Sequence, residues 1–277
     1  MIMKRIIVPI DFSAYSENAF LSAVLIASRV GAGITCVNVV ISELDWKHLP
    51  FKERNKHQDI LDLEAESMDK LKAFVLNHHV KNNLIEAIVG VGVPYEFITE
   101  LASQQNADLI VIGAYGKGYY EGRFIGSNLQ KVLRLADCPV LAVKTILQPS
   151  DLSKMVFASH FNEMSKPSFE KMKPFIRLSG ASVKFLYVNI PENKMDRRKI
   201  ENRMEDYARG EEDLNIKNHL LDFNEVEKGI ISFCENNQIG WIGIASNTRK
   251  TSSTYRIGVT DTLIYKSQYP ILSVKFD

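Results

Sequence analysis

The sequence predicts two tandem α/β domains, each built on a five-stranded parallel sheet. Two observations carry this prediction. Short runs of continuously apolar residues alternate with longer amphipathic segments, which is the pattern of buried parallel strands joined by helical crossovers. The same order of segments then occurs twice, on either side of a proline-containing polar stretch at residues 147–151. We therefore expect one domain over residues 1–146 and a second over residues 152–277.

The first domain is predicted from its apolar periodicity. The apolar runs indicate five strands, at residues 5–10, 34–40, 84–91, 109–113 and 140–143. Apolar residues at helical spacing indicate helices at residues 16–30, 59–79, 95–105 and 127–136. Gly31 and Gly33 are expected to end the first helix, because glycine is preferred just past a helix C-terminus. The polar segment 43–57 is expected to be an irregular surface excursion.

The second domain repeats this order. We expect strands at residues 155–158, 182–189, 216–221, 241–244 and 271–274, and helices at residues 168–178, 197–209, 226–236 and 260–266. Both halves end alike, with Ala-Asp-Cys-Pro-Val-Leu-Ala-Val at 136–143 and Ser-Gln-Tyr-Pro-Ile-Leu-Ser-Val at 267–274. A tandem repeat of one βα domain is the simplest interpretation of these similarities.

Composition limits the classes of function. Hydrophobic residues make up 45% of the chain and charged residues 24%, which is typical of a globular protein in water. The formal net charge of +1 gives no reason to expect a nucleic-acid or membrane partner, and no apolar run approaches the length of a membrane span. The three cysteines, Cys36, Cys138 and Cys234, are scattered without a C-x-x-C pair, so we expect reduced thiols in a cytoplasmic protein.

The segment that carries chemistry follows the predicted fourth strand. Gly113, Gly116 and Gly126 form a G-x2-G-x9-G pattern, with Ser127 and Asn128 at the start of the next predicted helix. Glycines permit unusual φ angles and a close approach of the backbone to a ligand. A helix N-terminus offers N–H groups and a favourable dipole to an anion. The pattern would occur by chance on the order of 0.01 times in a chain of this length, which favours a phosphate site over an ordinary glycine-rich loop.

This G-x2-G-x9-G-[S/T] segment resembles the ATP-binding signature of the universal stress protein family. The first strand is similar to that family's P-x-D-x-S opening, through Pro9, Ile10 and Asp11. The closing segment from 132 to 143 is similar as well. The resemblance is strong over residues 4–144, and over residues 153–276 it depends on strand order and the Pro-Ile-Leu-Ser-Val ending. It implies an adenine nucleotide alpha hydrolase-like, Rossmann-like fold with strand order 3-2-1-4-5.

The resemblance also implies roles for individual residues. Asp11 would bond the ribose or adenine side of ATP, ADP or AMP, with or without Mg²⁺, and the backbone of Val39 would meet the adenine edge. Ile112 and Gly113 would flank the ribose and phosphates. The phosphates themselves would contact Gly116, Gly126, Ser127 and Asn128. Lys117 and Arg123 lie within the loop, where they either add charge to the site or stay solvated, the commoner fate of a loop cation. Without the glycine pattern, Asp11 would be an equally good helix N-cap.

The second domain lacks much of this pattern. His160 stands at the position that matches Asp11, and the loop that begins at Gly243 has Ser246 and Arg256 where the pattern requires glycine. Gly258 could replace a missing glycine only if this loop were longer. We therefore expect no ATP site of the family's type here. His160 is expected to be structural or exposed, because no second metal ligand stands at a suitable spacing.

The remaining question is whether the protein catalyses a reaction. The chain has no G-x4-G-K-[S/T] sequence and no nucleophile–base spacing, so we expect no catalytic residue and no metal site. The favoured hypothesis is a regulatory protein whose nucleotide occupancy biases its conformation or partner binding in a stress response. An interaction module with a vestigial site, and a slow ATPase, stay open as alternatives. The family resemblance further suggests that strands 140–143 and 271–274 pair to make a pseudo-dimer, and it leaves a homodimer open.

Overall fold

The computed structural model describes residues 3–78, 84–118, 125–247 and 258–276. The chain divides into two compact units. The N-terminal unit comprises the described residues of Ile2–Cys138 and Val143–Ile146, and the C-terminal unit those of Pro139–Ala142 and Leu147–Asp277.

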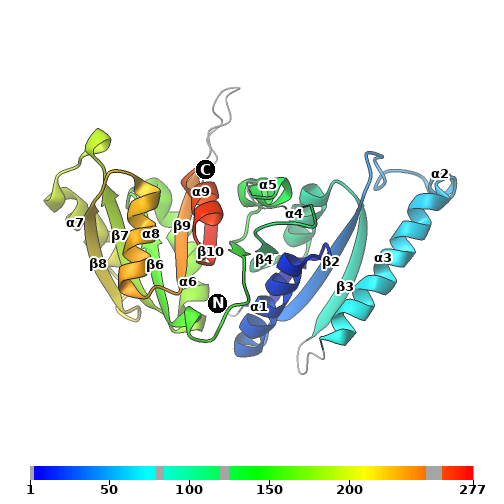
Figure 1. The fold of residues 1–277 in the computed structure, drawn as a ribbon, viewed down its shortest axis with the longest axis horizontal. Coiled ribbons are helices and arrows are strands. Elements are labelled where there is room, and N and C mark those ends of the chain that lie inside the picture. Colours follow the sequence, from blue (N-terminus) through cyan, green and yellow to red (C-terminus); the bar gives the residue numbers. More distant parts are fainter. Residues whose placement is uncertain (1–2, 79–83, 119–124, 248–257, 277) are drawn as a thin grey trace. The chain divides into compact units, whose positions relative to one another are not determined.

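The N-terminal unit is a parallel sheet with helices on both faces (Figure 1). Its elements are β1 (Arg5–Pro9), α1 (Ala14–Val30), β2 (Gly33–Ile41), α2 (Phe51–Arg54), α3 (Gln58–Asn77), β3 (Ile85–Gly92), α4 (Pro94–Gln104), β4 (Leu109–Gly113) and α5 (Ser127–Leu135). The strands are ordered β3-β2-β1-β4. Since β1 to β3 progress in one direction and β4 returns to the other side of β1, right-handed crossovers place α1 and α3 on one face, and α4 and α5 on the opposite face.

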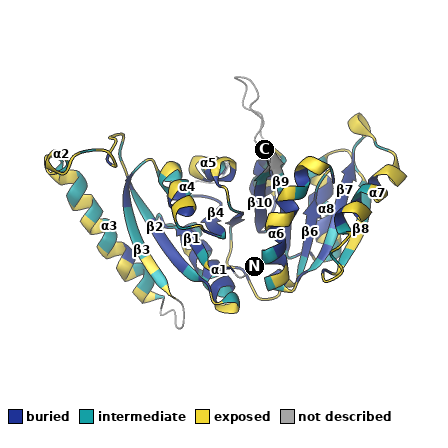
Figure 2. Ribbon diagram, turned by 180° about the vertical axis from the view of Figure 1, so that it is seen from behind, coloured by how far each residue is buried: buried dark blue, intermediate teal, exposed yellow. Residues whose placement is uncertain are grey.

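The core of this unit lies along the two central strands. Ile6, Ile7 and Val8 of β1 are fully buried, and so are Leu109 and Ile110 of β4. Figure 2 shows these strands as buried while the outer face of α3 is exposed. Burial on both faces explains why the strands are continuously apolar rather than alternating.

Two local expectations are corrected in this unit. Gly31 ends α1 in the left-handed conformation with φ 70°, but Gly33 already begins β2. The segment 43–57 is not a mere surface excursion. It contains the short helix α2, and its Trp46 is 6% exposed and packs with Val40 and Val91. The sequence pattern missed this contact because a single buried tryptophan in a polar segment has no periodicity.

The C-terminal unit has a related sheet. Its elements are β5 (Val140–Val143), β6 (Lys154–Ala158), α6 (Lys166–Ser179), β7 (Ser182–Asn189), α7 (Arg197–Ala208), β8 (Ile216–Asp222), α8 (Val226–Asn237), β9 (Trp241–Asn247), α9 (Val259–Lys266) and β10 (Ile271–Phe276). The order β8-β7-β6-β9-β10 is parallel throughout. Strand β5, whose residues 140–142 group with this unit, runs antiparallel to β10 with Leu141 opposite Leu272. The sheet is therefore mostly parallel rather than wholly so.

The two units share an unusual backbone feature after their first strands. Phe12 and Phe161 both have positive φ, 62° and 49°, which is rare for a bulky residue. Ser13 and Asn162 follow them, and each side chain caps the helical turn that comes next. The shared conformation identifies Asp11 and His160, which directly precede the two phenylalanines, as equivalent positions.

Candidate functional site

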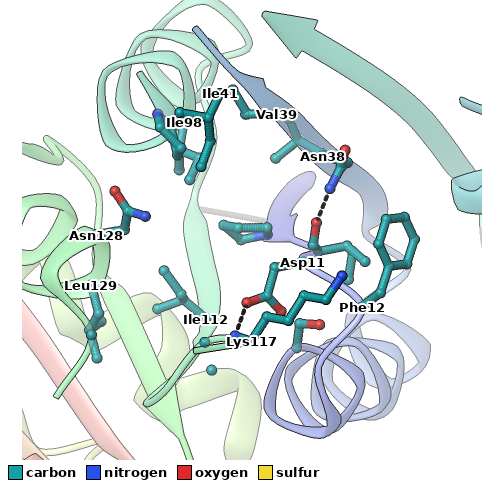
Figure 3. Close-up of a pocket in the computed structure, with 18 of the residues that line it drawn as sticks. Asp11, Phe12, Asn38, Val39, Ile41, Ile98, Ile112, Lys117, Asn128 and Leu129 are labelled. Carbon is teal, nitrogen blue, oxygen red and sulfur yellow. Dashed lines mark hydrogen bonds between the residues drawn. The ribbon is translucent and has the colours of Figure 1, made fainter. Parts of the chain in front are cut away.

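A cavity of about 910 Å³ opens at the carboxyl edge of the N-terminal sheet (Figure 3). This is the edge at which open parallel sheets bind ligands. All eleven residues predicted for the site line the cavity, namely Pro9, Ile10, Asp11, Val39, Ile112, Gly113, Gly116, Lys117, Gly126, Ser127 and Asn128. The parallel strands bring them together because the ends of β1, β2 and β4 meet at one edge. Arg123 lies outside the described residues.

Asp11 holds the glycine loop at the tip of β1. Its Oδ2 accepts a hydrogen bond of 2.7 Å from the backbone N–H of Lys117. Its Oδ1 accepts hydrogen bonds from the backbone N–H and the hydroxyl of Ser13, at 3.0 and 2.5 Å. Ser13, not Asp11, is the N-cap of α1. The N-cap alternative for Asp11 is therefore wrong, and the carboxylate faces the cavity and its loop.

The glycines at 113 and 116 are needed for space rather than for unusual φ. Neither has a positive φ, which corrects one reason for expecting glycine there. A Cβ on Gly113 would lie 2.7 Å from the carbonyl carbon of Tyr15 in α1. A Cβ on Gly116 would lie 2.9 Å from Oδ2 of Asp11. Both distances are shorter than van der Waals contact, so β4 and its loop can approach α1 and Asp11 only without side chains.

Gly126 serves a different purpose from the other two glycines. It is the N-cap of α5 with φ −60° and ψ 137°, and a Cβ there would meet no atom of the described residues closer than 3.9 Å. The packing of the described part of the chain therefore does not require glycine at this position. Ser127 and Asn128 form the exposed first turn of α5, whose N–H groups have no partner within the helix. Because the N-cap residue Gly126 has no side chain, the N–H groups of this turn stay accessible from the cavity.

The cavity extends over both faces of the sheet, with Asp11 between its two parts. We call the part beside Pro94, Ile98 and Leu129 the α4–α5 lobe, after the helices that supply these residues. The α1–α3 lobe lies on the opposite face, where the lining residues are Phe12, Ser16, Leu63, Ser67 and Lys70.

Sequence reasoning missed several lining residues. They include Asn38, Ile41, Leu63, Ser67, Lys70, Ile98 and Leu129. Asn38 donates a hydrogen bond of 2.7 Å to the carbonyl of Ile10, which ties the end of β2 to the end of β1. Leu63, Ser67 and Lys70 follow one another at helical spacing on α3, but they do not form the apolar stripe that periodicity detects. Their common face is recognisable only once α3 is placed beside β2 and β3.

The charged groups that line the described part of the cavity are two lysines and one carboxylate, Lys70, Lys117 and Asp11. Lys70 also pairs with Glu66 on the preceding turn of α3, at 2.6 Å between Nζ and Oε1. The hydrogen bond from Lys70 lowers the pKa of the Glu66 carboxyl below its usual value. Both side chains are more than half exposed, and such surface pairs contribute little to stability. Two cations against one anion make the cavity suited to an anionic ligand.

The C-terminal unit places different chemistry at the equivalent edge. His160 occupies the position of Asp11, and its ring contacts that of Tyr187 edge-on at 5.9 Å between centroids. Tyr187 lies at the position of Asn38, since β7 pairs with β6 in the same register as β2 with β1. A shallower cavity of about 470 Å³ lies here, lined by His160, Tyr187, Glu192, Asn193, Lys194 and Met195. An imidazole and a phenol ring thus replace the carboxylate and the amide.

Strand register corrects the comparison of the two glycine loops. Leu109 lies opposite the second residue of β1, and Trp241 lies opposite the second residue of β6. Counted from these two positions, Gly113 corresponds to Ala245 and not to Gly243. Sequence comparison missed this because the adjacent glycine at 243 gave a false match two residues too early.

The corrected register gives both loops the same length. Gly126 and Gly258 each lie thirteen residues after the position of the first glycine, and each is the N-cap of the helix that follows. The expectation that Arg256 replaces the third glycine is therefore wrong. The C-terminal unit retains that glycine, but it has Ala245 in place of the first glycine and Val259 in place of Ser127. The counterpart of Gly116 lies outside the described residues.

The described part of the chain shows no features of several other classes of site. No group of three or more His, Cys, Asp or Glu side chains there is placed to hold a metal ion. Among the helices that the structure describes, none combines the length and the apolarity that crossing a bilayer requires. Burial raises the pKa of the Cys36 and Cys234 thiols to about 12, so neither is activated as a nucleophile.

Comparisons with known proteins agree with this architecture. The sequence profile of the universal stress protein family matches residues 3–144. A curated Staphylococcus aureus (strain USA300) relative, named for the same family, is 32% identical over 165 residues, which cover 58% of this chain and 95% of the relative.

Two solved structures share the fold over the whole chain. The universal stress protein from Archaeoglobus fulgidus DSM 4304 has a TM-score of 0.69 at 19% identity and covers 98% of both chains. A structure from Pseudomonas aeruginosa UCBPP-PA14 has a TM-score of 0.64 at 15% identity and covers 99% of this chain and 94% of that one. At these identities the two structures support the fold alone. Because the family profile spans more than half of the sequence, this chain belongs to the universal stress protein family.

Proposed function

We propose that the N-terminal unit binds an adenine nucleotide in the cavity at its carboxyl edge and that occupancy regulates the protein in a stress response. The observation that carries this proposal is the meeting of three features in one cavity. A carboxylate, a glycine loop and an uncovered helix N-terminus all face it. Each suits a different part of a nucleotide.

The base and the sugar are assigned by polarity. Val39, Ile112, Ile98 and Leu129 offer an apolar surface that suits a flat aromatic base (Figure 3). The Asp11 carboxylate accepts hydrogen bonds and repels phosphate, so the group beside it would be a ribose hydroxyl. A carboxylate has about four acceptor sites, which leaves capacity for a hydroxyl beyond the bonds to Ser13 and Lys117.

The phosphates are assigned to the first turn of α5. The N–H groups after Gly126 lack partners within the helix, and the helix dipole favours negative charge there. Ser127 and Asn128 would add side-chain donors. Lys117, whose side chain runs past Asp11 toward Phe12, would add positive charge from the other side of the sugar (Figure 3). Bound Mg²⁺ would neutralise part of the polyphosphate charge.

Three further parts of the proposal concern the whole chain. The second domain is proposed not to bind ATP in the family manner, because Ala245 and His160 replace Gly113 and Asp11. The strands β5 and β10 are proposed to make a pseudo-dimer of the two domains, and a homodimer is a further proposal. ATP, ADP and AMP are all candidate ligands.

The test compares two matched glycine variants. The purified protein and its Gly126→Ala and Gly258→Ala variants are titrated with ATP, ADP and AMP by calorimetry, with and without Mg²⁺. Gly126→Ala should weaken nucleotide binding by about tenfold or more, because its methyl group covers donors to a charged phosphate, each worth about 1.5–3 kcal/mol. Gly258→Ala makes the same change at the same N-cap position of the other unit, where a Cβ meets nothing within 4 Å among the residues that the structure describes. This variant should bind nucleotide as the parent does.

The outcomes separate the candidate functions. A ligand at a hundred times its Kd stabilises the folded state by about 2.7 kcal/mol, so a thermal shift accompanies binding. Absence of heat and of a thermal shift with all three nucleotides would refute the proposal and favour an interaction module of the same fold. Phosphate release by the parent protein that is lost in Gly126→Ala would favour a slow ATPase.

A further inference from the structure

A simple 5′-nucleotide placed as proposed above would leave the α1–α3 lobe unfilled. Phe12, Ser67 and Lys70 line it on the face of the sheet opposite to α4 and α5. A base and a 5′-phosphate chain between β2 and the first turn of α5 would remain on the α4–α5 side of Asp11. The cavity therefore continues past the proposed sugar position into a space that has its own lining.

The two helices that border the α1–α3 lobe are held together by side-chain contacts. Helix α3 is held against α1 by an edge-on ring contact between Phe74 and Phe20, at 5.2 Å between centroids. At the end of α3, Nε2 of His78 lies 2.9 Å from Oε1 of Glu17 in α1. These contacts hold α3 against α1, so the helix positions from which Ser67 and Lys70 reach the lobe are fixed.

Two cations converge on this lobe from different elements. Lys70 lines it from α3, and the Lys117 side chain runs past Asp11 on the side of Phe12 (Figure 3). Glu66, the partner of Lys70, does not line the cavity. An exposed pair of this kind is weak, so the Lys70 ammonium can share its donors with an anion in the lobe.

Asp11 determines how such an anion must be attached. Its carboxylate repels a phosphate directly beside it but accepts a hydrogen bond from a ribose hydroxyl. A ligand that passes Asp11 with its sugar and places negative charge beyond it carries that charge on the other ribose hydroxyl. We propose that the α1–α3 lobe, through Lys70 and Ser67, binds a phosphate carried on a ribose hydroxyl of the adenine nucleotide. This inference rests on the proposed function and specifies its ligand class.

The experiment measures a ratio of affinities. AMP, adenosine 3′,5′-bisphosphate and adenosine 2′,5′-bisphosphate are titrated into the parent protein at one fixed salt concentration. At least one bisphosphate should bind about tenfold more tightly than AMP, as expected for one additional charge-assisted hydrogen bond. Lys70→Met should reduce this ratio to about two or less. Lys72→Met removes a lysine from the exposed face of the same helix and should preserve the ratio.

Each of the other possible outcomes refutes a specific claim about the lobe or about nucleotide binding. If AMP and ATP bind but neither bisphosphate is preferred, or if Lys72→Met changes the ratio as much as Lys70→Met, the ribose-phosphate site is refuted while the proposed function stands. If inorganic phosphate added with AMP tightens AMP binding as much as the attached phosphate does, the lobe takes a free anion instead. If no adenine nucleotide binds, the proposed function fails and this inference fails with it.

Discussion

Replacing Gly113 by alanine should destabilise the ligand-free protein. The new Cβ would lie 2.7, 2.8 and 2.9 Å from the carbonyl carbon, the carbonyl oxygen and the Cβ of Tyr15. Two of these atoms are backbone atoms of α1, so a change of rotamer cannot relieve the contact, and α1 must move away from β4 by several tenths of an ångström. Overpacking of this kind costs about 1–3 kcal/mol, which lowers Tm by roughly 3–10 °C for a unit of this size.

The assay is a thermal melt followed by circular dichroism without nucleotide. Gly126→Ala is the matched control, since its Cβ meets nothing closer than 3.9 Å in the described part of the chain, and its Tm should stay within about 2 °C of the parent value. In the C-terminal unit, Ala245 stands at the equivalent position, and the counterpart of Tyr15, Met164, lies in a 3-10 turn before α6 and is 56% exposed. Equal melting temperatures for Gly113→Ala and the parent would refute the claim that the first glycine is required by helix packing.

Three further predictions concern other parts of the chain. Burial raises the pKa of the Cys36 and Cys234 thiols from the ordinary 9.0 to about 12, so the unfolded chain loses these protons first and stability should fall as the pH rises from about 9 toward about 12. Urea midpoints should show a smaller fall in the two Cys→Ala variants, and an equal fall would contradict this cause. Tyr207→Phe should cost about 1–2 kcal/mol in urea unfolding, because the buried hydroxyl that lies 2.6 Å from Oγ of Ser165 is lost; an unchanged midpoint would count against that contact. Trp46 packs against Val40 of β2, which lines the cavity, so the fluorescence of Trp46 should change when ATP binds. The change should vanish in Trp46→Phe, and a signal that survives in that variant would have another origin.

Local patterns predicted most of the elements and the composition of the site. Periodicity identified the strands and helices because burial on both sheet faces makes a strand continuously apolar. The glycine pattern and Asp11 were identified from chemistry and resemblance, and the structure brings them into one cavity. The role of each glycine was not predictable. Gly113 is required by a helix that is distant in sequence, whereas the fold permits a side chain at Gly126.

The comparison of the two domains shows a second limit of the sequence. Gly243 looked like the counterpart of Gly113 because sequence comparison matches identical residues that lie near each other. Only the hydrogen-bond register of β9 with β6 assigned that place to Ala245. Register is a property of paired strands, so a single sequence does not contain it.

The sequence by itself determined the alternation of strands and helices, the repeat and the family, because these depend on hydrophobic periodicity and short motifs. Only the tertiary structure decided which side chains share the cavity. Lys70 and Ser67 reach it because α3 crosses beside β2, and Asn38 reaches it because β2 ends next to β1. The physical reason is that local preferences act between neighbours in the chain, whereas a binding site is formed by contacts between elements that the packing of the core brings together.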